Sequence, residues 1–195
     1  MSSNGNRAQR IGIWVIAIVM TVGTIGSFLV IILSNNNAKI DQAQSAKDYA
    51  AYQQQQQAAA QSNADNSEGF GGYTSRQFDA SSVSTLKVEV LKQGTGAAVN
   101  TTDTVTVSYF GWLSTGSIFD SSKKKDASAD APVSLSLGQV ISGWTEGLNG
   151  VRVGSIVRLT IPAAKAYGAT PSGVIPANSP LEFIVEIHSI DKASA

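Results

Sequence analysis

The chain contains no cysteine and a single histidine, and these absences exclude several kinds of chemistry. Without cysteine there can be no disulfide, thiol nucleophile, iron–sulfur cluster or cysteine-ligated zinc. One histidine excludes a multi-histidine metal site, and we expect no metal and no cofactor. The 14 basic and 14 acidic residues cancel, whereas nucleic-acid-binding proteins usually carry a basic excess. Nucleic acid is therefore not an expected partner.

Charge and hydropathy divide the 195 residues into segments of different character. Residues 11–33 form an uncharged apolar run of 23 residues, long enough for a helix to cross a bilayer core of about 30 Å. A retained transmembrane helix is the interpretation we favour. A cleaved signal peptide, whose apolar region usually has about 7–15 residues, and a buried core helix are the alternatives.

The orientation of this segment follows from its flanking charges. Arg7 and Arg10 precede it without any acidic residue, while Lys39 after it is balanced by Asp41. Because positive flanks stay inside, we expect residues 1–10 to be cytoplasmic and the chain after Leu33 to be extracytoplasmic. The expected location is the cell membrane, with a single pass.

Residues 34–82 are polar and of low complexity. Residues 38–61 consist mainly of good helix formers with few large apolar side chains, which predicts a fraying single helix or a weak coiled coil. Residues 62–75, SNADNSEGFGGYTS, have the composition of a flexible linker. The segment is interpreted as a stalk that holds residues 83–195 away from the membrane.

Residues 83–195 alternate between apolar and polar side chains with a period of two, which is typical of strands with one buried face. Val105, Val107 and Tyr109 fall on one face of such a strand, and Gly, Ser, Asp and Pro separate the strands. One stretch, SGWTEGLNGV, has helical spacing instead, with Ser142 as the expected N-cap. The predicted fold class is α+β, with a twisted antiparallel β-sheet and a solvated outer face, wrapped around one short α-helix.

The usual catalytic constellations are absent from this domain. His188 ends a strand and is interpreted as an exposed edge residue, and no GxSxG motif accompanies it. Asp120, Asp126 and Asp130 share one loop but lack the other positions of a calcium loop. Aromatic and aliphatic residues remain, which either line an apolar pocket or form plain core: Tyr109, Phe119, Val140, Ile141, Trp144, Tyr167, Ile175 and Phe183.

Several motifs occur together between residues 86 and 191: VSYFGWL, IFDSS, GQVISGWTEGL, VGSIVRLTIP, AYGAT and GVIPANSPLEFIVEI. In this order and spacing they resemble the FKBP-type peptidyl-prolyl cis-trans isomerases. The fold of that family, an antiparallel sheet curled around a short helix, agrees with the pattern above. The resemblance implies catalysis of X–Pro bond rotation, proline-containing polypeptides as partners, and macrolide inhibitors as ligands.

The resemblance also implies roles for individual residues. Trp144 would form the floor under the proline ring, and the Ile141 N–H and the Tyr167 hydroxyl would donate to the peptide's carbonyls. The implied catalytic set is Tyr109, Phe119, Asp120, Ile141, Trp144, Tyr167 and Phe183, and the implied substrate-binding set is Val133, Val140 and Ile175.

The sequence departs from the family pattern around this site. The loop after Ser122 is longer, and no arginine stands where the family often pairs one with the pocket aspartate. Lys123–Lys125 are the candidate substitutes; otherwise they are a solvated loop or a surface that attracts anionic chains or membranes. Val133 stands where the family often has phenylalanine, and the loop TPSGVIPA lacks a histidine that many members carry.

Together, these features predict a membrane-anchored prolyl isomerase that assists the folding of exported proteins. A non-catalytic peptide-binding chaperone module of the same fold is the alternative. A scaffold protein in which the aromatic residues are only core is a third interpretation.

Overall fold

The computed structural model describes residues 40–125 and 131–192. The predicted transmembrane segment 11–33 lies outside this range, and no helix within the described range is long and apolar enough to cross a membrane. The chain divides into two compact units, residues 1–59 and 60–195. Helix α2, Ile40–Asn66, begins in the first unit and ends in the second. Within the first unit, Tyr49 and Tyr52 on α2 are exposed, as expected of a helix without an apolar face.

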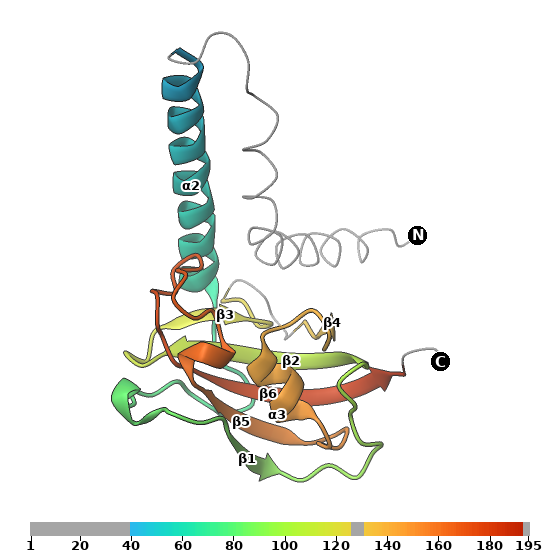
Figure 1. The fold of residues 1–195 in the computed structure, drawn as a ribbon. Helices are drawn as coiled ribbons and strands as arrows, with labels where there is room; N and C mark the ends of the chain where they lie inside the picture. Colours follow the sequence, from blue (N-terminus) through green and yellow to red (C-terminus); the bar gives the residue numbers. More distant parts are fainter. Residues whose placement is uncertain (1–39, 126–130, 193–195) are drawn as a thin grey trace. The chain divides into compact units, whose positions relative to one another are not determined.

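A six-stranded antiparallel sheet forms the second unit, as predicted (Figure 1). The strand order is β1-β5-β6-β2-β3, and β4 pairs with β2. The strands are β1 (Lys87–Lys92), β2 (Thr104–Leu113), β3 (Ile118–Ser121), β4 (Val133–Ser136), β5 (Ile156–Ile161) and β6 (Leu181–Asp191). Two 3₁₀ turns complete the elements, η1 (Ala80–Ser82) and η2 (Ala163–Lys165).

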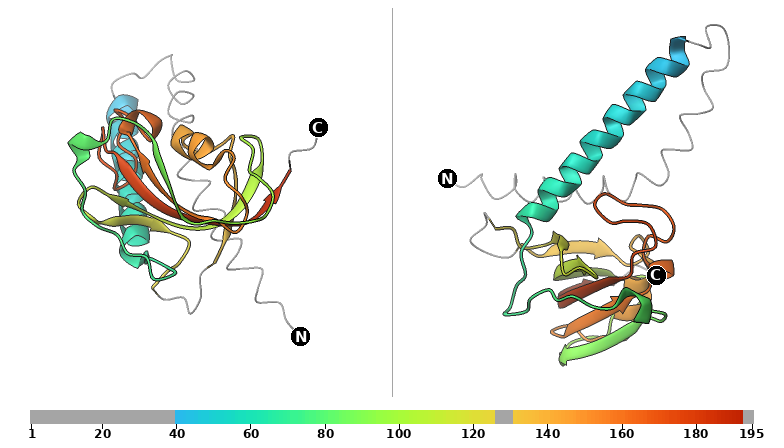
Figure 2. Two further views of the ribbon diagram at one scale, coloured as in Figure 1. Left: turned by 90° about the horizontal axis from the view of Figure 1, so that it is seen from below. Right: turned by 90° about the vertical axis from the view of Figure 1, so that its left-hand side faces the viewer.

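The short helix α3, Ser142–Leu148, lies in the hollow of the curved sheet (Figure 2). Its two glycines, Gly143 and Gly147, allow close approach: a Cβ on Gly143 would lie 2.4 Å from Ile161 Cγ2. The predicted N-cap is wrong by one residue, since Ile141 occupies that position without a side-chain cap and Ser142 is already helical.

Apolar side chains pack on both faces of the sheet. The concave face carries the main core, which includes Leu148 of α3 and the inward residues of the central strands. A second cluster lies on the opposite, convex face and consists of Phe70, Phe110, Trp112, Ile156 and Ile184. The prediction of a solvated outer face is therefore wrong for this part of the sheet.

The cover of the convex face comes from the segment interpreted as a flexible linker. The Phe70 ring packs edge-on against Phe110 at a centroid distance of 5.6 Å, and Trp112 Nε1 donates to the Arg76 carbonyl at 2.9 Å. The compact unit of residues 60–195 therefore includes part of the segment interpreted as a linker. The sequence did not predict this packing, because the contact depends on a single aromatic ring in a segment of low-complexity composition.

Candidate functional site

Four aromatic rings meet on the concave face, and we call Tyr109, Phe119, Trp144 and Phe183 the aromatic cluster. The Trp144 ring contacts the rings of Tyr109 and Phe183 edge-on, at centroid distances of 5.4 and 5.3 Å. Phe119 and Phe183 meet in the same way at 5.5 Å. Such edge-to-face contacts fix ring orientation because the positive edge of one ring faces the negative face of the next.

The aromatic cluster is assembled from different elements. Tyr109 lies on β2, Phe119 on β3, Trp144 on α3 and Phe183 on β6. Gly111 on β2 leaves the space the rings need, since a Cβ there would lie 2.4 Å from Phe183 Cε1 and 2.6 Å from Phe119 Cζ. All four rings are at least nine-tenths buried and belong to the main core.

The predicted substrate-binding residues belong to the main core or pack against it. Ile175 is buried in the main core. The other residues are half-buried and pack against this core: Val133, Val140, Ile141 and Tyr167. The apolar residues predicted for the site therefore share one core, in which the rings are buried and the other side chains pack against the core from partly exposed positions. We call these half-buried residues the rim.

Two hydrogen-bond donors at the rim were predicted to face a bound peptide. Among the described residues, neither the Ile141 N–H nor the Tyr167 hydroxyl has an intramolecular partner. Burial, reinforced by the negative charge of Asp120, raises the pKa of Tyr167 above its usual value. The Tyr167 hydroxyl therefore keeps its proton, and stays a donor, at any physiological pH.

Asp120 is the charged residue of the site. Its Oδ2 accepts a short hydrogen bond from the Tyr109 hydroxyl, and its Oδ1 accepts from the Ser121 N–H at 2.8 Å. Burial, together with the Asp120 charge and this hydrogen bond, raises the pKa of Tyr109 well above its usual value. Tyr109 is thus a permanent donor to the carboxylate, which holds the phenol ring edge-on to Trp144.

The last turn of α2, which belongs to the same compact unit, also reaches Asp120. Asn63 Nδ2 donates to Asp120 Oδ1 at 2.8 Å, and Lys124 Nζ lies 3.4 Å from that oxygen. Lys124 Nζ also donates to Asn63 Oδ1 at 2.7 Å. Sequence reasoning missed Asn63, since nothing in the polar stretch distinguishes it from neighbouring amides.

The lysine run therefore has defined contacts. Lys124 takes the place of the missing arginine beside Asp120, which is one of the alternatives predicted for the run. Lys123 Nζ pairs with Glu68 Oε2 at 3.1 Å, and Lys125 Nζ donates to the Asp65 carbonyl at 2.6 Å. Lys123 and Lys124 are only partly exposed, whereas Lys125 is exposed, as the solvated-loop interpretation expects. Together these lysines connect the loop after β3 to the end of α2 and the residues that follow it.

His188 lies apart from the site. Its Nε2 is 2.7 Å from Ser108 Oγ, and it projects from the face of β6 opposite Phe183. The side chain is exposed, as predicted, but β6 continues to Asp191 and lies between β5 and β2, so the prediction of an edge position at a strand end is wrong.

Comparison with known proteins identifies the family to which this chain belongs. The family model described as FKBP-type peptidyl-prolyl cis-trans isomerase matches residues 96–188. The FK506-binding protein of Neisseria meningitidis serogroup A is 42% identical over 103 residues, which cover 52% of this chain and 93% of that protein. The chain belongs to the FKBP-type peptidyl-prolyl cis-trans isomerase family, which confirms the predicted enzyme class and the predicted antiparallel sheet with a short helix.

Longer relatives share only this domain. The FKBP-type peptidyl-prolyl cis-trans isomerase FkpA of Aeromonas hydrophila is 44% identical over 115 residues, 59% of this chain and 41% of the relative. The outer membrane protein MIP of Legionella longbeachae is 39% identical over 110 residues, 56% of this chain and 46% of the relative. The chain thus spans less than half the length of these curated relatives.

Proposed function

We propose that this chain is a membrane-anchored isomerase that accelerates X–Pro bond rotation in exported polypeptides. The aromatic cluster and its rim are the proposed site, with Trp144 beneath the proline ring. The observation that carries the proposal is the combination of four buried rings with two rim donors that lack intramolecular partners among the described residues.

The chemistry needs no nucleophile and no general base. Rotation about the amide meets a barrier of about 18–20 kcal/mol because the nitrogen lone pair is delocalised into the carbonyl. Twisting the bond removes that delocalisation and its charge separation, so the twisted amide is less polar than the planar one. An apolar aromatic surface therefore binds the transition state more tightly than the ground state, which is the requirement for catalysis.

The rim donors would hold the peptide in position during the rotation. The Ile141 N–H and the Tyr167 hydroxyl would each donate to a carbonyl of the peptide, with the proline seated over Trp144. Fixed donors favour a peptide already bent toward the twisted geometry. Each thousandfold acceleration corresponds to about 4 kcal/mol of differential binding.

Asp120 would act by positioning rather than by proton transfer. Its carboxylate holds Tyr109, and Asn63 and Lys124 hold the carboxylate in turn. Removing Asn63 would leave Asp120 Oδ1 with the Ser121 N–H and Lys124 as its partners, which would loosen the carboxylate and with it Tyr109 against Trp144. Asn63 and Lys124 are thus proposed as positioning residues.

The proposed location is the outer side of a cell membrane. It is supported by the uncharged run 11–33, by Arg7 and Arg10 before it, and by helix α2, whose 27 residues would span about 40 Å. The name of one relative, outer membrane protein MIP, supports this location.

Two experiments test the proposal. Protease added to intact cells should remove a C-terminal epitope tag from the full chain while a cytoplasmic control protein survives. A tag cleaved only after lysis would contradict the location.

A binding assay alongside the isomerisation assay separates catalysis from the alternative of peptide binding alone. Proline peptides that bind the full chain without faster isomerisation would indicate a peptide-binding module. FK506, named in the relative from Neisseria meningitidis, is the inhibitor to try at the same site.

A further inference from the structure

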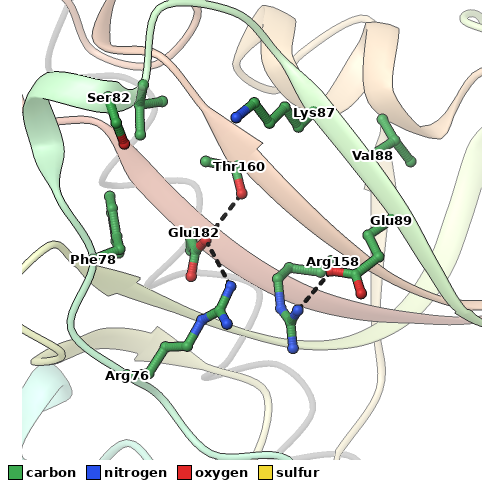
Figure 3. Close-up of a pocket in the computed structure, with 10 residues that line it drawn as sticks. Arg76, Phe78, Ser82, Lys87, Val88, Glu89, Arg158, Thr160 and Glu182 are labelled. Atoms are coloured by element: carbon green, nitrogen blue, oxygen red, sulfur yellow. Dashed lines mark hydrogen bonds and ion pairs between the residues drawn. The ribbon is translucent and has the colours of Figure 1, made fainter.

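A pocket lies on the convex face of the sheet, opposite the aromatic cluster (Figure 3). It has a volume of about 310 Å³ and is bounded by β1, β5, β6 and the segment that precedes β1. Glu182 and Phe183 are neighbours on β6, so their side chains project from opposite faces of the sheet. The pocket is therefore separate from the proposed isomerase site.

Glu182 forms the base of this pocket, and one of its oxygens lacks a partner. The side chain is 4% exposed; Oε1 accepts from Thr160 Oγ1 at 2.9 Å and lies 3.5 Å from Arg76 Nη2. Among the described residues, nothing donates to Oε2, although this atom is buried. A buried acceptor without a donor is destabilising, and more so when it is charged. A ligand that supplied a donor here would relieve that destabilisation.

Donors surround this acceptor. Arg158 Nη1 binds Glu89 Oε2 at 2.6 Å, but the buried Arg158 Nε has no acceptor among the described residues. Arg76 and Lys87 also line the pocket, and Figure 3 shows Lys87 reaching over it from β1. Three basic and two acidic side chains line the pocket. Arg76 and Arg158 pair with the two acidic side chains, so Lys87 gives the pocket a net positive charge around the acceptor at its base.

This arrangement selects the chemistry of the ligand. A simple cation would be repelled by the surrounding basic groups, and a simple anion by the carboxylate at the base. A peptide amide meets both demands, because it carries a donor for the carboxylate of Glu182 and an acceptor for the guanidinium of Arg158. Acidic side chains beside the amide would pair with Lys87 and Arg76. We propose that the convex pocket binds an extended, acidic polypeptide segment through its backbone.

Such a site would give a polypeptide a second point of attachment that does not require proline. Two linked contacts raise the residence of one chain without any new contact at the isomerase site. The proposal does not depend on the isomerase function, because the ligand and the face of the sheet both differ.

The test is a titration of the full chain in detergent micelles with the proline-free peptide acetyl-Glu-Thr-Val-Thr-Glu-amide. The readout is the ¹⁵N-detected Nε–Hε resonance of Arg158, one of only five arginines, assigned by its disappearance in Arg158→Lys. We expect this resonance to move on titration. Glu182→Gln, which replaces the Oε2 acceptor with an amide donor, should weaken binding about tenfold or more. Lys87→Ala should weaken it by a smaller factor.

The matched control is Glu186→Gln, on the same strand and the same face but outside the pocket. It should bind like the unchanged chain, and every variant should keep its X–Pro isomerisation rate. An Arg158 resonance that does not move, or that moves equally in Glu182→Gln, would show that the pocket holds only water. Equal binding of the peptide with lysine in place of glutamate would also overturn the proposal.

Discussion

The most specific consequence of the site concerns Asn63, which lies outside the segment that resembles the family. Asn63→Ala removes the 2.8 Å hydrogen bond to Asp120 and the 2.7 Å hydrogen bond from Lys124. A hydrogen bond to a charged group contributes roughly 1.5–3 kcal/mol, but Asp120 and Lys124 are each 28% exposed, so water replaces part of it. We take about 1 kcal/mol, which corresponds to about a fivefold loss of kcat/KM.

The assay follows isomerisation of an X–Pro tetrapeptide by the full chain in detergent. Lys123→Ala is the control, because it removes the 3.1 Å ion pair to Glu68, another tether between the same segments, without touching Asp120. Asn63→Asp supplies a second readout: two adjacent carboxylates repel, so its activity should be low at neutral pH and recover in acid. Equal losses in Lys123→Ala and Asn63→Ala, with a flat pH profile in Asn63→Asp, would reduce Asn63 to a tether and refute the reasoning.

Three other predictions concern the packing and ionisation of the same unit. Phe70→Ala should lower the free energy of unfolding by about 3 kcal/mol in a denaturant titration, because the Phe70 ring packs on Phe110. Tyr49→Ala is the control, because the Tyr49 side chain is exposed and its removal should leave the midpoint unchanged. An unchanged midpoint in Phe70→Ala as well would mean that the segment around Phe70 is a linker. Gly111→Ala should either unfold the domain or eliminate isomerase activity, because the new Cβ would clash with the rings of Phe183 and Phe119. A variant with normal stability and normal activity would show that the rings do not lie this close to Gly111. The pKa of buried Tyr109 is raised in the folded state, so the neutral phenol favours folding. This contribution to the free energy of unfolding is complete below the usual tyrosine pKa near 10 and is lost as the pH rises through the higher pKa of the folded state. Stability should therefore fall above about pH 10, less steeply in Tyr109→Phe, and equal slopes would exclude Tyr109 as the source.

The sequence predicted the concave side of this fold well. Period-two alternation placed Tyr109 and Phe183 on buried faces, and helical spacing placed Trp144 on a short helix. Both patterns are predictive because the side chains on one face of a strand or helix pack into the same core. The site residues themselves came from their resemblance to a family, since several aromatic residues in a sequence predict a core as readily as a pocket.

What the sequence did not reveal depends on single long-range contacts. Phe70 packs on the convex face from a Gly-rich stretch, and Asn63 reaches Asp120 across 57 residues of sequence. Neither contact has a periodic pattern, because each uses one side chain rather than a face. The buried Glu182 was hidden for a related reason: its position on β6 predicts exposure, and the segment before β1 covers it only in the folded chain.

The central claim is that an apolar aromatic surface, without acid, base or metal, lowers the barrier to X–Pro rotation. The direct measurement is the isomerisation rate of a single-proline tetrapeptide with the full chain, compared with Trp144→Leu and Tyr167→Phe, with folding of each variant checked by circular dichroism. The uncatalysed reaction takes tens to hundreds of seconds, and we expect the unchanged chain to shorten it greatly, with folded Trp144→Leu at least about tenfold slower and Tyr167→Phe slower by a smaller factor. A rate equal to that in buffer, or equal rates in all three proteins, would contradict the account.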